Sequence, residues 1–401
     1  MDKIINDPVY GFIRVSHPLI WKIIEHPYFQ RLRRIKQMGL AHLVYPGAVH
    51  TRFHHSLGAY HLMGNAIEEL RRKGVDITEE EGIAAQAAIL MHDIGHGPFS
   101  HSLESTIIEN AHHEEMSVWM MQELNRQTSG ALDMTIAIFR DTYPKHFLHQ
   151  LLSSQLDMDR MDYLNRDSFF TGVSEGVIGY DRILKMLAIK DDELVIEEKG
   201  VHSVEKFIVA RRLMYWQVYL HKTVLSAEQM LIRVLQRIKY LTRNGETLFA
   251  PPALQFFIGN PVTREALYQD GEVLTQFNLI DDSDIYTCLK IWAQHPDEIL
   301  SFLCESLLNR HLLKVRFSSE PLDEQVEEIK KQLAAQYSPG MLSYLVFCDS
   351  TSNSTYNPAD EKIKILLKNG AVKDISEVQN ALINPGLAIP VKKFYICFPK
   401  L

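Results

Sequence analysis

The sequence of 401 residues has few features of membrane, secreted or fibrous proteins. It contains no apolar run of about eighteen residues, the length that a membrane-spanning helix needs. The segment that begins MDKIINDPVYG lacks the basic and then apolar stretch of a signal peptide. Only 4 cysteines occur, all late in the chain and far apart. We therefore expect a cytoplasmic protein without a membrane span, a disulfide or a cysteine-based zinc site.

The chain also has fewer basic than acidic residues. The chain has 42 Lys and Arg residues against 50 Asp and Glu, a formal net charge of −8. This balance disfavours broad capture of nucleic acid by the whole surface, although it is compatible with a local basic pocket. A content of 46% hydrophobic and 23% charged residues is typical of a globular chain, and the length suggests two or three domains.

Helical spacing of apolar residues dominates the first three hundred positions. Residues 17–38 predict one amphipathic helix or two short ones, and Thr78 with Glu81 forms the capping-box signature of a buried helix. Further helical patterns occupy 56–72, 113–126, 130–140, 145–166, 178–188, 203–242 and 295–314, whereas β-rich runs occupy 344–348, 362–367 and 392–398. We expect a mostly α-helical protein, with a helical body over 1–314 and a small α+β C-terminal domain over 315–401.

Histidines are concentrated in one part of the chain, because ten of the 18 lie within residues 42–113. The strongest pattern is His92-Asp93, which ends a buried helix just before two glycines. An imidazole and a carboxylate on one ion suit a borderline divalent metal such as Fe, Mn, Co, Ni or Zn. Taken alone, the pair is better explained as a core histidine and a turn-capping aspartate. A metal site therefore needs support from elsewhere in the sequence.

Two further clusters supply that support. His54 and His55 lie just before a predicted helix, and three aspartates follow in DMDRMD (157–162). Such an acidic row is usually a solvated helix face, and Asp162 with Arg166 has the spacing of an i,i+4 ion pair. Each cluster alone is a weak signal. The evidence for a metal site is therefore the order in which His54-His55, His92-Asp93 and the aspartates of 157–162 follow one another.

Together the clusters resemble the HD-domain phosphohydrolases, whose metal site is written as His, then His-Asp, then Asp. The resemblance implies a helical HD core and one divalent metal per site, held by His55, His92, Asp93 and Asp159. Four blocks are similar to the deoxynucleoside triphosphate (dNTP) triphosphohydrolases of the SAM-and-HD-domain type and their bacterial relatives: YFQRLRRIKQMGLAHLVYPGAVHTRFHHSLGAYHL (28–62), LMHDIGHGPFSH (90–101), DMDRMDYLNRD (157–167) and ARRLMYWQVYLHK (210–222).

In that family water attacks the α-phosphorus, which releases the deoxynucleoside and intact triphosphate. Charge on the nucleotide requires a cation at the phosphorus and basic side chains along the phosphates, with Mg²⁺ accompanying the nucleotide. The resemblance assigns phosphate contacts to Arg52, Arg160 and Arg211. Any one of these arginines could instead be a solvated surface residue. This alternative is weakest for Arg52, which lies three residues from a predicted ligand.

The family's pocket histidines match His96, His101 and His113, and Glu104 stands where the family more often has Asp. We expect His101 to act as the acid near the leaving group, since a histidine of near-neutral pKa can protonate O5′. On the same resemblance, Glu104 and His113 form a coupled acid/base pair, while His96 contacts phosphate. The longer Glu104 side chain changes the geometry of that pair.

Deoxyribose contacts also follow from the resemblance. Tyr163 and Asp167 bracket the sugar, with Asp167 accepting from the 3′-OH, and Gln37 matches a base or sugar contact. Tyr219 stacks beneath the sugar and would exclude a 2′-OH. Without the surrounding motif, both tyrosines would be explained by core packing.

Regulation is a separate inference. Relatives can be activated by a guanine nucleotide bound between subunits of a homo-oligomer, a dimer or tetramer. The positions that match this effector site are Glu25, Gln30, Arg33, Lys222, Arg310 and Lys314. Other basic positions of that site are not reproduced near 197–199. An amphipathic packing helix with solvated charges explains residues 25–33 equally well.

Three other functions remain open. The same ligands serve other HD enzymes, including nucleoside monophosphate phosphatases, (p)ppGpp hydrolases and cyclic-dinucleotide phosphodiesterases. A non-catalytic nucleotide sensor is a second alternative, although all four ligands are intact. Nucleic-acid binding or exonuclease activity at the metal site is a third, which the acidic balance disfavours.

Overall fold

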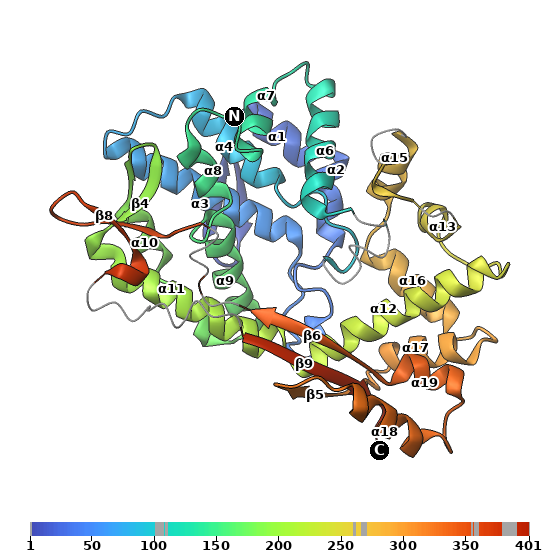
Figure 1. The fold of residues 1–401 in the computed structure, drawn as a ribbon. Helices are drawn as coiled ribbons and strands as arrows, with labels where there is room; N and C mark the ends of the chain where they lie inside the picture. Colours follow the sequence, from blue (N-terminus) through green and yellow to red (C-terminus); the bar gives the residue numbers. More distant parts are fainter. Residues whose placement is uncertain are drawn as a thin grey trace.

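The computed structural model describes residues 2–100, 108, 111–259, 262–265, 271–353, 356, 361–378 and 391–400 (Figure 1). Its first elements are β1 (Lys3–Asp7), β2 (Gly11–Val15), α1 (Pro18–Glu25), α2 (Pro27–Gln30), α3 (Arg52–Arg72), α4 (Glu79–Met91), α6 (His113–Gln127), α7 (Asp133–Phe139), α8 (His146–Leu152) and α9 (Met158–Thr171). The middle of the chain forms α10 (Tyr180–Met186), β3 (Leu187–Lys190), β4 (Glu193–Glu197), α11 (Val201–Met214), α12 (Lys222–Arg243), α13 (Pro252–Gly259), α15 (Gly271–Leu279), α16 (Asp282–Trp292) and α17 (Glu298–Leu308). The last elements are β5 (Lys314–Ser318), α18 (Asp323–Leu333), α19 (Pro339–Leu345), β6 (Phe347–Asn353), β7 (Lys364–Leu366), β8 (Val372–Asp374) and β9 (Val391–Phe398).

Helices α3, α4 and α9 form the centre of the helical body, with α3 packed against both of the others. Helix α4 is apolar on nearly every side because it contributes to two hydrophobic clusters. Ala85 and Ala88 belong to the cluster shared with α3, α9 and α11, while Ala87 and Leu90 belong to the cluster shared with α1 and α12. Small alanine side chains let neighbouring helices approach α4 closely. The predicted fold class, mostly α-helical, is confirmed.

The predicted start of α4 is confirmed by its hydrogen bonds. The Thr78 hydroxyl accepts from the Glu81 backbone N–H at 3.1 Å, and the Glu81 carboxylate accepts from the Thr78 N–H at 2.8 Å. This reciprocal cap satisfies two backbone donors and stabilises the helix start by about 1 kcal/mol. The cap fixes where α4 begins, and the helix ends at Met91, directly before His92.

Two of the helices predicted from periodicity are interrupted. The run 145–166 divides into α8 and α9, because Asp157 accepts from the Arg160 backbone N–H and so caps a new helix. The run 203–242 divides at a π-helical turn, Tyr215–Tyr219, before α12 begins. Apolar spacing continues across both breaks, which is why periodicity alone missed them. The predicted strand over 344–348 was wrong in its first half, where α19 ends.

The C-terminal residues contribute to two separate sheets. One is antiparallel, in the order β5-β9-β6, and lies beside α12 (Figure 1). The other has the order β3-β4-β7-β8, in which β7 pairs in parallel with β4 of the helical body. The domain division at residue 314 stays a prediction, but β7 joins the two sequence regions directly. Among the described residues, no helix is long and apolar enough to cross a membrane.

Candidate metal centre and adjoining cavity

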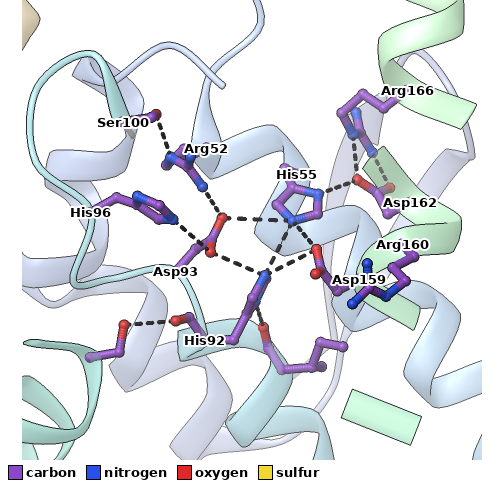
Figure 2. A network of polar contacts seen from close by, with 12 residues as sticks. Arg52, His55, His92, Asp93, His96, Ser100, Asp159, Arg160, Asp162 and Arg166 are labelled. Atoms are coloured by element: carbon purple, nitrogen blue, oxygen red, sulfur yellow. Dashed lines mark hydrogen bonds and ion pairs between the residues drawn. The ribbon is translucent and has the colours of Figure 1, made fainter. Parts of the chain in front are cut away.

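Three helix ends bring the four predicted metal ligands together (Figure 2). His55 lies in the first turn of α3, and Asp159 lies in the first turn of α9. His92 ends α4, and Asp93 follows it in the turn. His55 is fully buried and Asp93 is 5% exposed, whereas the Asp159 side chain is 30% exposed and lines the adjoining cavity, so the cluster is buried on one side only.

The ligand atoms are spaced as an ion would require. His55 Nε2 lies 2.9 Å from Asp159 Oδ1, 3.2 Å from His92 Nε2 and 3.7 Å from Asp93 Oδ2. His92 Nε2 lies 3.3 Å from Asp93 Oδ1 and 3.4 Å from Asp159 Oδ1. Neighbouring ligands of an octahedral ion with bonds of about 2.1 Å are about 3.0 Å apart. The ligand atoms of His55, His92 and Asp159 all lie within 4.8 Å of one another, so these three side chains fit one divalent cation. Asp93 borders both histidines, and it forms a second such group with His96 and His113.

Hydrogen bonds behind the two rings direct their lone pairs at this cation position. His92 Nδ1 donates to the Ile89 carbonyl at 2.6 Å, and His55 Nδ1 donates to Asp162 Oδ2 at 2.7 Å. In the neutral rings both Nε2 atoms then carry lone pairs, and these face each other. Two facing lone pairs beside carboxylates are stable only with a positive charge between them.

The pKa of His55 shows the same preference for positive charge. Burial lowers this pKa, but hydrogen bonds to Asp159 and Asp162 outweigh burial and bring it to about 10. The surrounding carboxylates thus create a negative potential at Nε2. The donor chemistry and the electrostatics both fit a metal held by His55, His92, Asp93 and Asp159.

A buried charge network supports His55 from behind. Arg166 donates from Nε and Nη2 to both oxygens of Asp162, at 2.9 Å and 3.0 Å. Its Nη1 donates to Asp7 of β1 at 2.7 Å. Asp162 and Arg166 thus form the predicted i,i+4 ion pair, but both are 0% exposed, so the interpretation as a solvated helix face was wrong. Periodicity could not reveal this, because the face of α9 that carries the pair packs against α3.

Gly58 of α3 makes room for that network. A Cβ atom at this position would lie 1.9 Å from Asp162 Oδ1 and 2.2 Å from Arg166 Nη2. Both contacts are far shorter than van der Waals distance. The glycine that ends the HHSLG sequence (54–58) was the signal in the sequence for a close approach at this site.

On the other side of the cluster, Asp93 pairs with the guanidinium of Arg52. Arg52 Nε also donates to Ser100 Oγ at 2.8 Å. His96 Nε2 lies 3.3 Å from Asp93 Oδ1, and its ring stacks on that of His113 with centroids 3.9 Å apart. Arg52 and His96 are thus positioned by a metal ligand itself. Ser100 was not among the predicted residues, although it lies in the GHGPFSH block.

A cavity of about 580 Å³ opens beside the metal cluster. Every predicted phosphate, sugar and base contact lines it, as do two of the predicted catalytic histidines: Gln37, Arg52, His96, His113, Arg160, Tyr163, Asp167, Arg211 and Tyr219. Burial lowers the pKa of Arg211, and its neighbour Arg160 contributes to this shift. Two guanidinium groups close to each other favour an anion between them. The predicted residues His101 and Glu104 lie outside the described residues.

Away from the metal, a carboxylate forms part of the cavity wall. The Tyr219 hydroxyl donates to Asp167 Oδ2 at 2.8 Å, and His50 Nε2 lies 2.7 Å from Oδ1. His50 stacks on Phe170, with ring centroids 4.4 Å apart. Prediction from the sequence missed His50 because nothing in its local pattern links it to a residue 117 positions away. Tyr163 packs edge-on against Tyr219, so both tyrosines have a cavity role as well as a packing role.

The predicted effector residues fall into two separate groups in one chain. Glu25, Gln30 and Arg33 line a hollow of about 280 Å³, where Arg33 Nε donates to Gln30 Oε1 at 2.9 Å. The basic residues Lys222, Arg310 and Lys314 line another hollow of about 960 Å³, together with further cationic side chains of β5 and the C-terminus.

Comparison with known proteins connects these features to a family. The HD domain profile matches residues 52–167, and the HD associated region profile matches 178–247. The chain is 35% identical to the uncharacterized protein YwfO of Bacillus subtilis, over 95% of this chain and 88% of that protein. It is 33% identical to the human deoxynucleoside triphosphate triphosphohydrolase SAMHD1, but over only 55% of this chain and 42% of that protein.

Solved structures support the same relationship. A crystal structure of a phosphohydrolase from Bacteroides thetaiotaomicron is 50% identical, with full coverage of both chains and a TM-score of 0.96. A hypothetical protein from Aquifex aeolicus is 26% identical, covers 99% of this chain and 96% of its own, and has a TM-score of 0.75. The similarity therefore extends over the whole chain and not only over the metal cluster.

The hydrogen bond behind His55 generates a prediction about metal affinity. Asp162→Asn replaces one acceptor oxygen by an amide nitrogen that faces N–H donors, so the His55 ring loses its fixed orientation. We expect the affinity for Mn²⁺ to fall about ten- to a hundred-fold, measured by competition with a chelator. Asp157→Asn on the same helix is the control, since Asn also caps helices and Asp157 does not bond to His55. Equal affinities in the two variants would contradict the prediction.

Gly58→Ala should disturb the same network by steric overlap. The new methyl group must displace Asp162 or Arg166, so the free energy of unfolding should fall by about 1–3 kcal/mol in urea titrations. Gly259→Ala is the comparison, because a Cβ atom there meets only Gln255 at 3.9 Å. A Gly58→Ala protein as stable as the Gly259→Ala protein would show that the network tolerates displacement.

Proposed function

The chain belongs to the HD-domain phosphohydrolases, and on that premise we propose that it hydrolyses dNTPs at the α-phosphorus, releasing the deoxynucleoside and triphosphate. One observation carries the proposal. The same cavity is lined by the predicted metal ligands Asp93 and Asp159, by three arginines and by Asp167 with aromatic rings. A nucleotide needs a cation, phosphate contacts and a sugar contact in that order, and this cavity offers all three.

The chemistry at phosphorus depends on positive charge and on a proton source. A divalent cation, when bound, supplies charge at the α-phosphate and makes water more acidic. Arg52, Arg160 and Arg211 supply fixed charge for the remaining phosphate oxygens. Asp93 pairs with Arg52 and so sets the position of that guanidinium relative to the metal ligands. This arrangement stabilises the charge that develops as the bond to the leaving oxygen breaks.

The leaving O5′ needs a proton at the end of the reaction. His101 is our choice for this acid, with Glu104 and His113 as a coupled pair and His96 as a phosphate contact. The described part of the site supports the last role, because His96 lies against Asp93 and stacks on His113 at the cavity wall. Arg52 nearby also lowers the pKa of His96, after burial as the main cause, so His96 is a neutral hydrogen-bond donor there.

Recognition of the sugar falls to Asp167. Its two oxygens already accept from Tyr219 and contact His50, which hold the carboxylate in one orientation. A carboxylate has about four acceptor positions, so Asp167 can still accept from a 3′-OH. Burial and the charge of Asp167 raise the pKa of Tyr219, which keeps the hydroxyl protonated as a donor. In this proposal Tyr219 stacks beneath the sugar and excludes a 2′-OH.

Regulation and assembly complete the proposal. The basic hollow at Lys222, Arg310 and Lys314 suits the phosphates of a guanine nucleotide, and the hollow at Gln30 and Arg33 suits its base. Since the two hollows are separate within one chain, a nucleotide would bridge them only in a homo-oligomer, a dimer or tetramer in the cytoplasm. The alternatives to dNTP hydrolysis are another HD-type phosphohydrolase activity and a non-catalytic nucleotide sensor. Product analysis distinguishes each of them from the proposed reaction.

Product analysis tests the reaction. Protein loaded with Mn²⁺ should convert dGTP or dATP into the deoxynucleoside and triphosphate, resolved by ion exchange, with GTP cleaved far more slowly. Asp159→Ala should lose bound metal and turnover together, because the first-turn carboxylate of α9 is removed. Release of pyrophosphate or orthophosphate, or no turnover with or without a guanine nucleotide, would exclude the proposed reaction. A variant that keeps full turnover without metal would exclude the site.

The effector proposal makes a separate prediction. GTP should stimulate dATP hydrolysis, and Lys314→Ala should raise the GTP concentration for half-maximal stimulation about ten-fold, because one charge that faces the phosphates is lost. Lys373→Ala on β8 is the control, since this exposed lysine lies in the other sheet. Stimulation of wild type that is unaffected by Lys314→Ala would place the effector elsewhere, and a complete lack of stimulation would remove it.

A further inference from the structure

A buried carboxylate outside both matched family regions joins two sides of the catalytic cavity. Asp282, the first residue of α16, is 4% exposed. Its Oδ1 accepts from the Phe99 backbone N–H at 2.8 Å, and its Oδ2 accepts from the Lys36 backbone N–H at 2.9 Å. Each of these donors is next to a cavity residue, since Gln37 follows Lys36 and Ser100 follows Phe99. One side chain thus ties together segments that are 63 positions apart.

The segment held at Phe99 has an unfavourable backbone conformation. Phe99 and Ser100 have φ angles of 53° and 54°, in the left-handed region that residues with a Cβ rarely adopt. Two such residues in succession are unfavourable, so surrounding contacts must hold them. The bond from the Phe99 N–H to Asp282 is one of those contacts. The left-handed turn also directs Ser100 toward Arg52.

Ser100 connects this turn to Arg52 through hydrogen bonds. Its hydroxyl donates to the Lys36 carbonyl at 3.2 Å and accepts from Arg52 Nε at 2.8 Å. Arg52 in turn pairs with the metal ligand Asp93 (Figure 2). A continuous set of hydrogen bonds therefore runs from α16 through Ser100 to the phosphate-binding guanidinium.

Helix α16 does not need Asp282 for its own start. Asp281 is the N-cap, with its carboxylate accepting from the Ser283 N–H, and Asp284 completes the capping box. Burial raises the pKa of Asp282 to about 6, although the two backbone amides lower it. A carboxylate that is costly to bury and is not used by its own helix has a function elsewhere.

We infer that Asp282 is a positioning residue for the active site, which holds the turn at Phe99 and Ser100 so that Arg52 is aligned for the α-phosphate. Its effect on turnover rests on the proposed function, whereas its effect on the turn does not. Asp282 touches neither substrate nor metal in this scheme and acts only through Ser100 and Arg52. The accessory helices after residue 270 thereby contribute to catalysis.

The first test measures the turn itself. Asp282→Asn places an amide nitrogen against one of the two backbone donors, so one of the two hydrogen bonds is lost. Hydrogen exchange followed by mass spectrometry should show at least ten-fold faster exchange in peptides that cover Lys36 or Phe99. Asp281→Asn is the matched control: it removes the same charge one residue away, keeps a good N-cap, and contacts Arg34 instead of the turn.

The second test measures turnover of a dNTP with metal content determined in parallel. For Asp282→Asn we expect kcat to fall about ten- to a hundred-fold, with KM within about threefold and metal content unchanged, since the ligands and the sugar wall are intact. Asp281→Asn should stay near wild type. Ser100→Ala should resemble Asp282→Asn, and the double variant should be no slower than the slower single variant, because both act through one contact.

The outcomes separate the two proposals. Unchanged exchange in Asp282→Asn, equal losses in both aspartate variants, or additive losses with Ser100→Ala would overturn the positioning role. Unaltered kcat in Asp282→Asn would do so as well. If wild type hydrolyses no dNTP, the proposed function fails, and the exchange comparison of the two aspartate variants still decides whether Asp282 holds the turn.

Discussion

The convergence of two imidazole nitrogens and carboxylate oxygens in one place is the constraint on which the rest of the molecule depends. His55 Nε2 and His92 Nε2 are 3.2 Å apart, with Asp159 Oδ1 within 3.4 Å of both. Such a cluster of lone pairs is stable only around a cation. Bringing it together requires α3, α4 and α9 to place their ends at one point, which is why these helices pack against each other at the centre of the body.

The groups behind the ligands are as constrained as the ligands. Asp162 fixes the His55 ring, Arg166 pairs with Asp162, and Asp7 of the N-terminal hairpin accepts a further hydrogen bond from Arg166. Burying these charges is costly, and a hydrophobic replacement of similar volume could be at least as stable. The free-energy cost of burying these charged groups is explained by their role in orienting the His55 ring. The hairpin β1–β2, far from the ligands in sequence, is therefore part of the metal site.

The sequence predicted what is local and missed what is distant. The ligands His55, His92, Asp93 and Asp159 could be assigned because three short motifs together resemble a known family, and the Thr78 cap because its pattern spans four residues. Spacing on α9 could not show whether Asp162 and Arg166 face water or α3, since the same i,i+4 pattern serves both. The contacts of His50 with Asp167 and of Asp282 with Phe99 depend on tertiary packing alone. The pairing of β7 with β4 could not be predicted for the same reason.

The position of the cavity explains why metal ligands alone do not determine the substrate. The HD domain match begins at Arg52 and ends at Asp167, and it contains all four ligands. The cavity, however, also has Gln37 and Met38 from before this region and Tyr215 and Tyr219 from after it. Asp282, later still, anchors the turn that carries Ser100. Segments that flank the HD match therefore build part of the cavity wall, so proteins that share the ligands can differ in the rest of this cavity.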